Sequence, residues 1–349
     1  MREITLVNWG LGAMGSGIAK LVSRKRGLVS VGAFDSDPGK WGRNLSEVLG
    51  LKGSTDVVIQ EPPQFDLGIS DVDIVLIATG SYTRQVVQQI EVAVNAGSNV
   101  ITIAEEMAFP AAQQPELAEY LDKIAKNKGV TILGTGINPG FVLDTLVIAL
   151  TGTCLDVQKI TATRVNDLAP FGPTVMATQG VGVTVQQFRD GLADGSIVGH
   201  IGFQASINLI AKSLGWKIDE IRETREPIVS KVRRQTEYAT VEPGNVAGCK
   251  HTAQGMLHGR VLIELIHPQQ VLPQLEGVAT GDYIKIAGEP ALNLQIQPEI
   301  PGGLGTMAMA VNMIPQVIAA KPGLLSMADL PIPAALLGDA REILAMRRG

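Results

Sequence analysis

The most constraining feature of this sequence is its opening, where a short apolar run leads directly into a spaced set of glycines. Residues 4–7 read Ile-Thr-Leu-Val, which is typical of a β-strand, and Gly10, Gly12 and Gly15 follow at G-x-G-x-x-G spacing. From Ile18 onward the apolar residues recur at helical intervals. The pattern predicts a strand, a tight turn and a helix, as in a Rossmann-type α/β fold with a doubly wound parallel sheet.

Each glycine has a separate physical task in a dinucleotide-binding turn. Gly10 permits the turn, the missing side chain at Gly12 lets a pyrophosphate approach the backbone, and Gly15 lets the helix pack on the strand. The diphosphate is then expected on the unpaired N–H groups at the start of the helix. The glycine pattern alone is a weak signal, since the chain contains 39 glycines. The expected cofactor-binding set also includes the intervening residues Leu11, Ala13 and Met14.

A second apolar run strengthens this interpretation because it ends in an acid. Residues 28–34 are followed by Asp35, about 20 residues beyond the glycine turn, where a dinucleotide fold places the acid that binds the adenosine ribose. Asp35 favours NAD, since a carboxylate repels the 2′-phosphate of NADP. Lys40 and Arg43 follow closely, and their positive charges are suited to pairing with that phosphate. We therefore expect NAD or NADP to bind, with Ser36 beside Asp35.

Composition limits the remaining function classes. The chain of 349 residues is long enough for two domains, and 45 % of its residues are apolar, enough for a core in each. The formal net charge is −5 without a run of Lys or Arg, which argues against a nucleic acid or anionic membrane as partner. No signal segment is apparent, and no apolar stretch reaches the ~20 residues of a membrane span, so we expect a cytoplasmic protein. The cysteines and histidines lack metal-ligand spacing, so no metal is predicted.

Three further apolar runs complete the first predicted domain, at residues 74–78, 99–104 and 130–133. Their continuous apolar character is typical of parallel strands covered by helices on both faces. Ligands bind at the carboxyl ends of such strands. The residues that follow the first of these runs are therefore expected beside the cofactor: Thr79, Gly80 and Ser81.

The hydrophobic pattern of the sequence changes near residue 141, where apolar and polar residues begin to alternate. This alternation, clear in residues 159–166, is typical of a sheet with one wet face. We predict an antiparallel sheet in an α+β domain for substrate binding and dimerisation over residues 141–304. The dinucleotide-binding domain spans residues 1–140, and residues 305–349 return to it through an apolar helix over 306–319. Further strand candidates are residues 228–232, 239–241, 249–266, 283–286 and 292–296.

Glu105 is the candidate for proton transfer. It stands at the carboxyl end of the apolar run 99–104 without an evident basic partner in the adjacent sequence, and partial burial there raises the pKa of a carboxyl group. The alternative is that Glu105 or Glu106 caps the following helix. Because one of two adjacent acids must point away from the cofactor, Glu106 is expected to be the structural partner.

Other polar residues are candidates for substrate binding. Asn138 lies in an Asn-Pro-Gly turn, where it either holds a substrate group or shapes the turn. Arg164 and Asn166 are two residues apart and share a strand face; this suits capture of a carboxylate, and an ordinary surface arginine is the alternative. His267 follows an apolar strand and is expected to lie at the opening between the two predicted domains. The same position is expected for His200, on weaker grounds. We expect two histidines on the polar face of strands: His251 and His258.

Several of these stretches together resemble the 2,4-diaminopentanoate dehydrogenase family, which includes the native amine dehydrogenases. The resemblance lies in residues 8–15, 104–107, 136–141 and 164–166 and covers nearly the full length, and the first domain is similar to that of dihydrodipicolinate reductase. It implies oxidative deamination of 2,4-diaminopentanoate to 2-amino-4-oxopentanoate and ammonia with NAD(P)⁺. The reverse reaction is reductive amination of a ketone.

The resemblance also implies the roles of individual residues. The catalytic glutamate falls on Glu105, and the pocket residues fall on Asn138, Arg164, Asn166 and His267, with His200 added. It leaves open whether Arg164 grips a substrate carboxylate or frames the pocket, and it implies a homodimer built through the second domain.

Two other functions fit parts of the sequence. One is a reductase of a C=N bond in the manner of dihydrodipicolinate reductase, although the paired histidines and adjacent lysine expected of that family are missing. The other is a non-catalytic NAD(P)-binding regulator, which needs no acid beside the nicotinamide.

Overall fold

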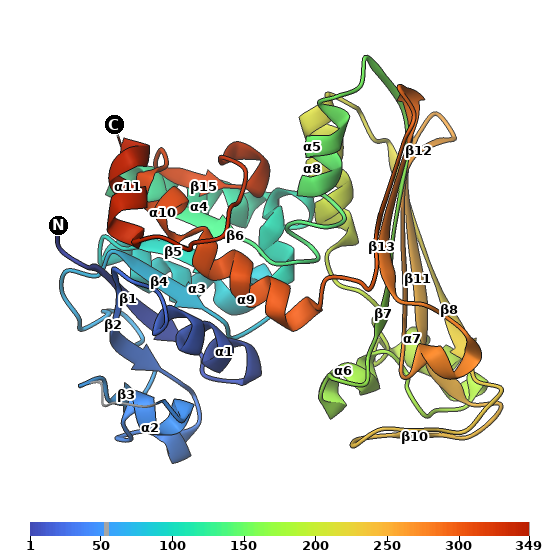
Figure 1. Cartoon of the computed structure of the whole chain (residues 1–349), viewed down its shortest axis with the longest axis horizontal. Helices are drawn as coiled ribbons and strands as arrows, with labels where there is room; N and C mark the ends of the chain where they lie inside the picture. The colour runs from blue at the N-terminus through green and yellow to red at the C-terminus, as the bar shows by residue number, and fades with distance from the viewer. Residues whose placement is uncertain (52–55, 349) are drawn as a thin grey trace. The chain divides into compact units, whose positions relative to one another are not determined.

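The computed structural model describes residues 1–51 and 56–348, and the chain divides into two compact units (Figure 1). Unit 1 comprises Met1–Phe141 and Gly302–Gly349, and unit 2 comprises Val142–Pro301. Unit 1 is therefore built from both ends of the chain, and unit 2 is inserted between them.

Unit 1 contains a seven-stranded sheet in the order β15-β6-β5-β4-β1-β2-β3. Every pairing between its described strands is parallel, which confirms the predicted doubly wound class. The chain leaves β1 toward β2 on one side and later adds β4 on the other, so the strand order reverses between β1 and β4. The strands are β1 (Ile4–Trp9), β2 (Leu28–Phe34), β3 (Ile59–Gln60), β4 (Ile74–Ile77), β5 (Asn99–Thr102), β6 (Thr131–Gly134) and β15 (Gly323–Leu325).

Apolar clusters cover both faces of this sheet. Val75 and Ile77 of β4 join α3 and α4 in one cluster, whereas Ile74 and Leu76 join α1, α9, α10 and α11 in the other. This alternation explains why the strands read as continuous apolar runs. The helices of unit 1 are α1 (Ala13–Val22), α2 (Leu45–Leu49), α3 (Thr83–Asn95), α4 (Pro115–Lys128), α9 (Gly302–Asn312), α10 (Ile314–Ala319) and α11 (Ala340–Arg348).

The segment Gly302–Ala319 is the one described stretch long and apolar enough to cross a membrane, with a mean hydropathy of 1.2. Half of it is buried, and α10 contributes Ile314 and Val317 to the core of unit 1. Its apolar character is therefore that of a core element. The single helix predicted over 306–319 is wrong in one respect, because the segment is divided into α9 and α10. Pro315 explains the division, since it has no N–H to donate to the preceding turn.

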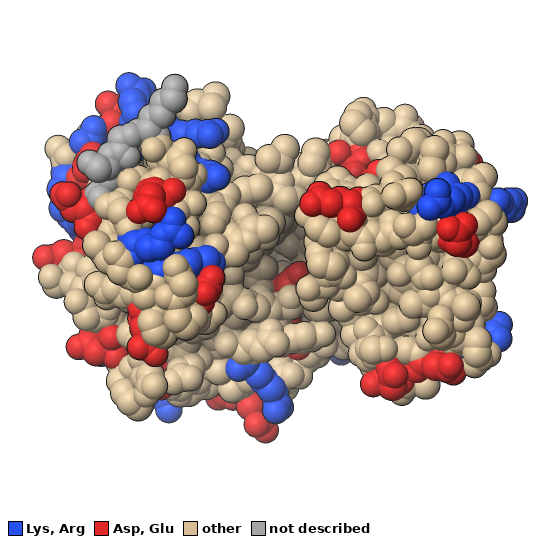
Figure 2. All heavy atoms as spheres, turned by 90° about the horizontal axis from the view of Figure 1, so that it is seen from below, with Lys and Arg blue, Asp and Glu red and all other residues tan. Residues whose placement is uncertain are grey.

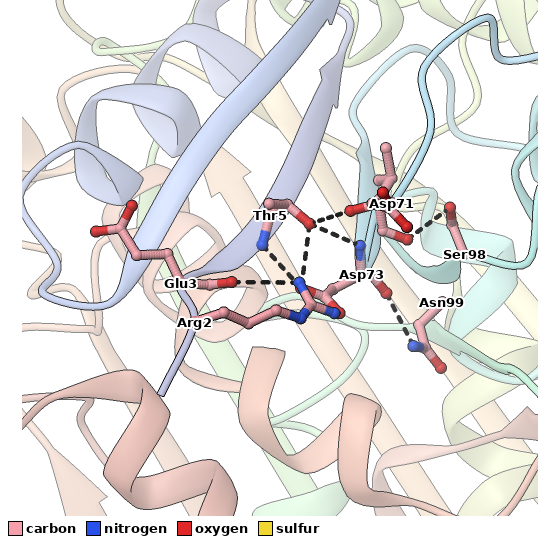
Figure 3. Close-up of polar contacts among 8 residues, drawn as sticks. Arg2, Glu3, Thr5, Asp71, Asp73, Ser98 and Asn99 are labelled. Carbon is pink, nitrogen blue, oxygen red and sulfur yellow. Dashed lines mark hydrogen bonds and ion pairs between the residues drawn. The ribbon is translucent and has the colours of Figure 1, made fainter.

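A polar cluster joins the amino ends of β1, β4 and β5, at the edge of the sheet opposite the carboxyl ends (Figure 3). The Asp73 carboxylate accepts hydrogen bonds from the Thr5 N–H at 2.9 Å and from Arg2 at 2.5 Å. The Asn99 amide donates to the Asp73 carbonyl oxygen at 2.9 Å. These bonds fix the register of three neighbouring strands, and we assign the cluster a structural role.

Unit 2 contains a six-stranded sheet in the order β14-β13-β7-β12-β11-β8. The prediction of a purely antiparallel sheet is wrong at one place, since β7 and β12 are parallel. The predicted strand 249–266 is instead a hairpin that turns at His258 and Gly259, both with positive φ. The strands are β7 (Asp156–Asp167), β8 (Glu220–Val229), β11 (Val246–Leu257), β12 (Arg260–Gln270), β13 (Gly281–Glu289) and β14 (Leu292–Ile296), with a separate pair, β9 (Arg234–Gln235) and β10 (Thr240–Val241).

The helices of unit 2 lie on one face of its sheet (Figure 1). Along β7 the buried residues alternate with half-buried ones, which matches one covered face and one face without a helix in the described part of the chain. Figure 2 shows Lys and Arg intermixed with Asp and Glu on the face in view. The helices are α5 (Thr145–Thr151), α6 (Pro173–Thr178), α7 (Val185–Asp194) and α8 (Phe203–Leu214).

Candidate active site

The glycine turn after β1 has the geometry that a dinucleotide requires. Gly10 has a φ of +92°, and a Cβ there would lie 2.6 Å from the carbonyl oxygen of Ala78. A Cβ at Gly15 would lie 1.8 Å from the carbonyl oxygen of Gly10, so α1 packs directly on the turn. A Cβ at Gly12 would meet no atom within 4 Å, and no side chain caps the helix start there. The open space at Gly12 and the helix start behind it fit a pyrophosphate.

Asp35 lies at the carboxyl end of β2, as predicted, and is almost fully buried. Its carboxylate accepts hydrogen bonds from the Leu11 N–H at 2.6 Å, the Asp37 N–H at 2.8 Å and the Lys40 ammonium at 3.0 Å. Burial acts to raise the pKa of Asp35, but these bonds and the Lys40 charge hold the pKa below its usual value. Asp35 is therefore an ionised group whose charge is balanced by Lys40.

The neighbouring Arg43 behaves differently from Lys40. Its guanidinium pairs with Glu47 at 2.8 Å on the exposed surface of α2. Ser36, next to Asp35, is exposed. Of the two cations that the sequence offers for a 2′-phosphate, only Lys40 is in contact with Asp35.

Glu105 begins a short 3-10 turn, η2 (Glu105–Ala108), just after β5, and is half-buried. Burial raises the pKa of its carboxyl group, while its own N–H and the Ser81 hydroxyl act in the opposite direction through hydrogen bonds. The pKa of Tyr82 is raised by burial and by the negative charges of Glu105 and Glu106. Residues at the ends of β4 and β5 therefore surround this carboxyl group.

Glu106 takes the structural role predicted for it. It is 3 % exposed, and its carboxylate accepts a hydrogen bond from the Thr83 N–H at 2.6 Å. It therefore caps α3, which precedes it in the chain, and not the helix that follows. Its own N–H donates to the Ser81 carbonyl oxygen at 3.0 Å. A Cβ at Gly134 would lie 1.9 Å from the Met107 carbonyl oxygen, so β6 also packs directly on this turn.

The remaining predicted residues of unit 1 follow β4 and β6. Thr79 is exposed and its hydroxyl donates to Gln89 at 2.5 Å, while Gly80 lies against the side chain of Gln85. Asn138 is half-buried in a compact turn that is attached to α9 by a 3.1 Å bond from the Ile137 N–H to the Thr306 hydroxyl. The structure therefore brings these residues to the same edge of the sheet as Glu105 and the glycine turn.

In unit 2, Arg164 is buried on the covered face of β7. One terminal nitrogen donates to the Asp282 carboxylate at 2.5 Å and the other to the Ile300 carbonyl oxygen at 2.5 Å. Both side chains of the ion pair are nearly inaccessible. The alternative of an ordinary surface arginine is therefore wrong, and the two contacts favour a framing role over capture of a carboxylate.

Asn166 shares this face with Arg164, as the spacing predicted, and it is also buried. The Asn166 side-chain oxygen lies 3.0 Å from Nε2 of His267, and the rings of His267 and His200 are 4.8 Å apart. Burial lowers the pKa of both histidines, that of His200 to about 3. Both imidazoles are therefore neutral at ordinary pH.

The expectation for His251 is wrong, and that for His258 is wrong as well, because His258 lies in the turn between β11 and β12 and not in a strand. His251 is completely buried, and its Nε2 lies 3.0 Å from the Glu223 carboxylate. It occupies the strand position opposite His267, so both point to the covered face of the sheet. His258 is exposed at the tip of the hairpin.

Sequence reasoning missed several residues in these clusters. Asp282 was not considered because it lies 118 positions from Arg164. Glu223 and His251 could have been found from strand alternation. Counting in steps of two along β8 and β11 puts both side chains on the same face of the sheet as the buried Ala253. Tyr82 adjoins the predicted Ser81 and could have been found from that position alone.

Unit 1 has the strand order, the open glycine turn and the buried acid of an NAD(P)-dependent dehydrogenase, which is the class to which this protein belongs. Residues 141–346 match the 2,4-diaminopentanoate dehydrogenase C-terminal domain family. The sequence is 44 % identical to 2,4-diaminopentanoate dehydrogenase of Acetoanaerobium sticklandii over 99 % of this chain and 98 % of that protein. The chain belongs to the 2,4-diaminopentanoate dehydrogenase family and is an oxidoreductase.

Two amine dehydrogenases are also similar to this chain. The enzyme of Streptomyces virginiae is 22 % identical, covering 95 % of this chain and 98 % of that protein. The solved structure of the amine dehydrogenase from Mycobacterium smegmatis has a TM-score of 0.83 and 28 % identity, covering 95 % of this chain and 97 % of that one.

Proposed function

We propose that the protein catalyses oxidative deamination of 2,4-diaminopentanoate to 2-amino-4-oxopentanoate and ammonia, and the reverse amination of ketones. The observation that carries this proposal is Glu105, a half-buried carboxyl group of raised pKa on the sheet edge that holds the glycine turn. It forms no ion pair within the described residues. A carboxyl group in such a place is suited to proton transfer. The relatives' printed names supply the substrate class.

The cofactor site is proposed from the same edge. The turn Gly10–Gly15 and the start of α1 would hold the diphosphate, Asp35 and Lys40 the adenosine ribose, and Thr79 to Ser81 the end nearer Glu105. The open space at Gly12 supports this assignment. When bound, the nicotinamide ring exchanges a hydride with the substrate carbon. The Asp35–Lys40 pair has no net charge, which supports the use of both NAD and NADP.

In the amination direction, Glu105 as a carboxylate takes a proton from ammonium, which frees the ammonia nitrogen to add to the ketone carbonyl. The protonated Glu105 then gives its proton to the carbinolamine hydroxyl, so that water leaves. The restored carboxylate stabilises the iminium cation, which receives the hydride. One carboxyl group can perform all three tasks, because the proton it takes, the proton it returns and the positive charge it stabilises are all on groups that are or become attached to the same substrate carbon. Deamination runs through these steps in reverse.

Polar residues of unit 2, together with Asn138, are proposed to hold the rest of the substrate. The candidates are Asn166, His267 and His200, which adjoin one another on the covered face of the sheet. Arg164 is proposed to frame this pocket through Asp282, since both of its terminal nitrogens are already bonded.

We also propose that the protein is a cytoplasmic homodimer that associates through unit 2. The half-buried residues on the helix-free side of β7 support this proposal, among them Thr161, Thr163 and Val165. These uncharged residues lie beside charged ones on the same face, among them the Lys159–Glu264 ion pair at 3.0 Å.

The decisive assay measures NADH and NADPH oxidation with 4-oxopentanoate or 2-amino-4-oxopentanoate, with and without ammonium. The proposal requires oxidation that depends on ammonium and an amine product. Turnover of a cyclic imine without ammonium would show the C=N reductase alternative. Cofactor binding without turnover of any amine or ketone would show the regulator alternative.

A further inference from the structure

The loop between β4 and α3 is held by a side chain from the first turn of α3. The Gln85 side-chain oxygen accepts hydrogen bonds from the Ser81 N–H at 3.0 Å and from the Tyr82 N–H at 3.2 Å. Glutamine at the third position of a helix commonly makes this contact with the residues before the helix. A Cβ at Gly80 would lie 2.7 Å from the same oxygen, so a side chain there would disturb Gln85. The glycine and the glutamine together fix the backbone of the loop.

The η2 turn holds the same loop from its other side. The Glu106 N–H donates to the Ser81 carbonyl oxygen at 3.0 Å, and the Glu106 carboxylate accepts the Thr83 N–H at 2.6 Å. Both backbone polar groups of Ser81 are therefore bonded, its N–H to Gln85 and its carbonyl oxygen to Glu106. The backbone of Ser81 is thus fixed beside the turn that carries Glu105.

The Ser81 hydroxyl is directed at Glu105 and not at the start of α3. A serine near a helix start commonly accepts a hydrogen bond from an N–H of the first turn. In α3 the first of these N–H groups, that of Thr83, is bonded to the Glu106 carboxylate. The Ser81 hydroxyl donates to the Glu105 carboxylate. Because hydrogen bonds are directional, a hydroxyl on a fixed backbone selects one orientation of the carboxylate that it meets.

The groups around Glu105 act on its ionisation in opposite directions. Burial raises the pKa of Glu105, whereas the hydrogen bonds from the Ser81 hydroxyl and from its own N–H act to lower it. The titratable groups beside it in the described part of unit 1 are Glu106 and Tyr82. The pKa of Tyr82 is raised by burial and by the charges of both glutamates, so Tyr82 is a neutral phenol at ordinary pH. A hydroxyl donor favours the ionised carboxylate, which is the form that acts as a base.

We propose that Ser81 is a positioning residue, whose hydroxyl holds the Glu105 carboxylate ionised and in one orientation. Gln85 and Glu106 act through Ser81, because they fix its backbone. The inference rests on the proposed function, and it adds that the loop after β4 sets the lower pH limit at which Glu105 works as a base. It concerns the hydroxyl of Ser81, whereas the proposed cofactor site is bordered by the loop as a whole.

The first test is the pH profile of kcat/KM for 2,4-diaminopentanoate. Deamination is lost as the pH falls through the pKa of Glu105, which gives the profile an acidic limb. Ser81→Ala removes the hydroxyl and keeps the backbone bonds, so the limb should move to higher pH. At a fixed pH on the limb, kcat/KM should fall about tenfold relative to the wild type, while the plateau at high pH should stay within about threefold. Ser81→Thr keeps a hydroxyl and should restore the wild-type limb.

Two variants of α3 test whether the loop is held for this purpose. Gln85→Met removes the acceptor of the two loop N–H groups, so it should move the limb in the same direction as Ser81→Ala. Gln88→Met is the matched control, since Gln88 is exposed on the same helix and its amide lies 3.4 Å from the Gln64 carbonyl oxygen. The control should keep the wild-type profile.

A second measurement does not depend on turnover. Carbon-13 NMR of protein labelled at the glutamate carboxyl carbons follows the titration of Glu105 in the free protein, and the resonance missing from Glu105→Gln identifies it. The Glu105 carboxyl should titrate at higher pH in Ser81→Ala than in the wild type or in Ser81→Thr. Fluorescence titration of the same variants with NAD(P)H should give nearly unchanged Kd values.

Three outcomes would overturn the inference. The first is a Glu105 titration and an acidic limb that stay in place in Ser81→Ala. The second is a loss of kcat/KM that is equal at every pH, which shows a structural role only. The third is a raised Kd for NAD(P)H with an unmoved limb, which shows that the hydroxyl binds the cofactor. If the titration shifts as expected but the wild type oxidises no amine with either cofactor, the proposed function fails while the control of Glu105 by Ser81 stands.

Discussion

Adjacent residues in this chain have opposite tasks, and Glu105 and Glu106 show it most directly. Glu106 is buried and bonded to the start of α3, whereas Glu105 is half-buried with the Ser81 hydroxyl as a side-chain partner and forms no ion pair within the part of the chain that the structure describes. The difference arises because the η2 turn directs successive side chains to different sides. Glu106 therefore holds the turn in place, and Glu105 remains available for proton transfer.

The first prediction concerns the pH dependence of deamination. Because burial raises the pKa of Glu105, the base is lost as the pH falls through that raised value, above the ~4.3 of an ordinary glutamate. The pH profile of kcat/KM should show this acidic limb. Glu105→Gln should remove the limb and lower kcat by about 10²-fold or more, with little change in NAD(P)H affinity. Near-normal turnover with the limb intact would contradict the role.

The second prediction concerns cofactor preference. Lys40→Ala leaves the Asp35 carboxylate uncompensated at the ribose site, so the ratio of kcat/KM for NADPH over NADH should fall about tenfold. Arg43→Ala should have a smaller effect, because Arg43 pairs with Glu47 on the surface. Steady-state kinetics with both cofactors provide the measurement. A larger change in Arg43→Ala than in Lys40→Ala would contradict the assignment.

The third prediction separates framing from carboxylate binding at Arg164. Arg164→Ala leaves Asp282 as an unpaired buried charge, which typically costs ~3–5 kcal/mol, so urea unfolding should show a large loss of stability. The loss of kcat/KM should be similar for 4-oxopentanoate and for a ketone without a carboxylate. A KM increase confined to the carboxylate substrate would instead show that Arg164 grips it. Asp282→Asn should reproduce the loss of stability.

At the scale of elements, the candidate cofactor site depends on how closely β1, β4 and α1 approach one another. The carbonyl oxygen of Gly10 and that of Ala78 occupy the space that side chains at Gly15 and Gly10 would need. Gly12 is the exception, because its side-chain position is open. Packing within unit 1 therefore requires glycine at positions 10 and 15. At position 12 packing makes no such demand, and the proposed diphosphate is the reason for a glycine there.

The fourth prediction follows from that difference. Gly12→Ala should leave the thermal unfolding temperature of the free protein nearly unchanged, because its Cβ meets no atom, but should weaken NAD(P)H binding at least about tenfold. Gly15→Ala should lower the unfolding temperature, since its Cβ overlaps the Gly10 carbonyl oxygen. Thermal melts without cofactor and fluorescence titrations with NAD(P)H check both. Equal stability losses in the two variants would contradict the assignment.

At the scale of the whole molecule, the face of the unit 2 sheet that carries no helix is a large surface for which the described residues provide no covering layer. The helices of unit 2 cover one face only, and the outer residues of β7 are half-buried even in the single chain. The proposed homodimer would cover this face.

The fifth prediction tests that dimer. Thr163→Arg places a long charged side chain in the middle of the outer face of β7, so it should convert the dimer to a monomer. Light scattering coupled to size exclusion measures the mass. His258→Asn, at the hairpin tip, should keep the wild-type mass. A wild type that is monomeric, or a Thr163→Arg variant with unchanged mass, would contradict the proposal.

The sequence by itself determined the class of unit 1 and the position of Asp35 and Glu105. These features depend on local spacing: glycines that only a tight turn requires, apolar runs that only doubly covered strands require, and acids at the ends of those runs. Only the tertiary structure decided the partner of Arg164, the burial of His251 and the parallel pairing of β7 with β12. Each of those depends on a segment far away in the chain, and periodicity describes which face a residue occupies but not which segment covers it.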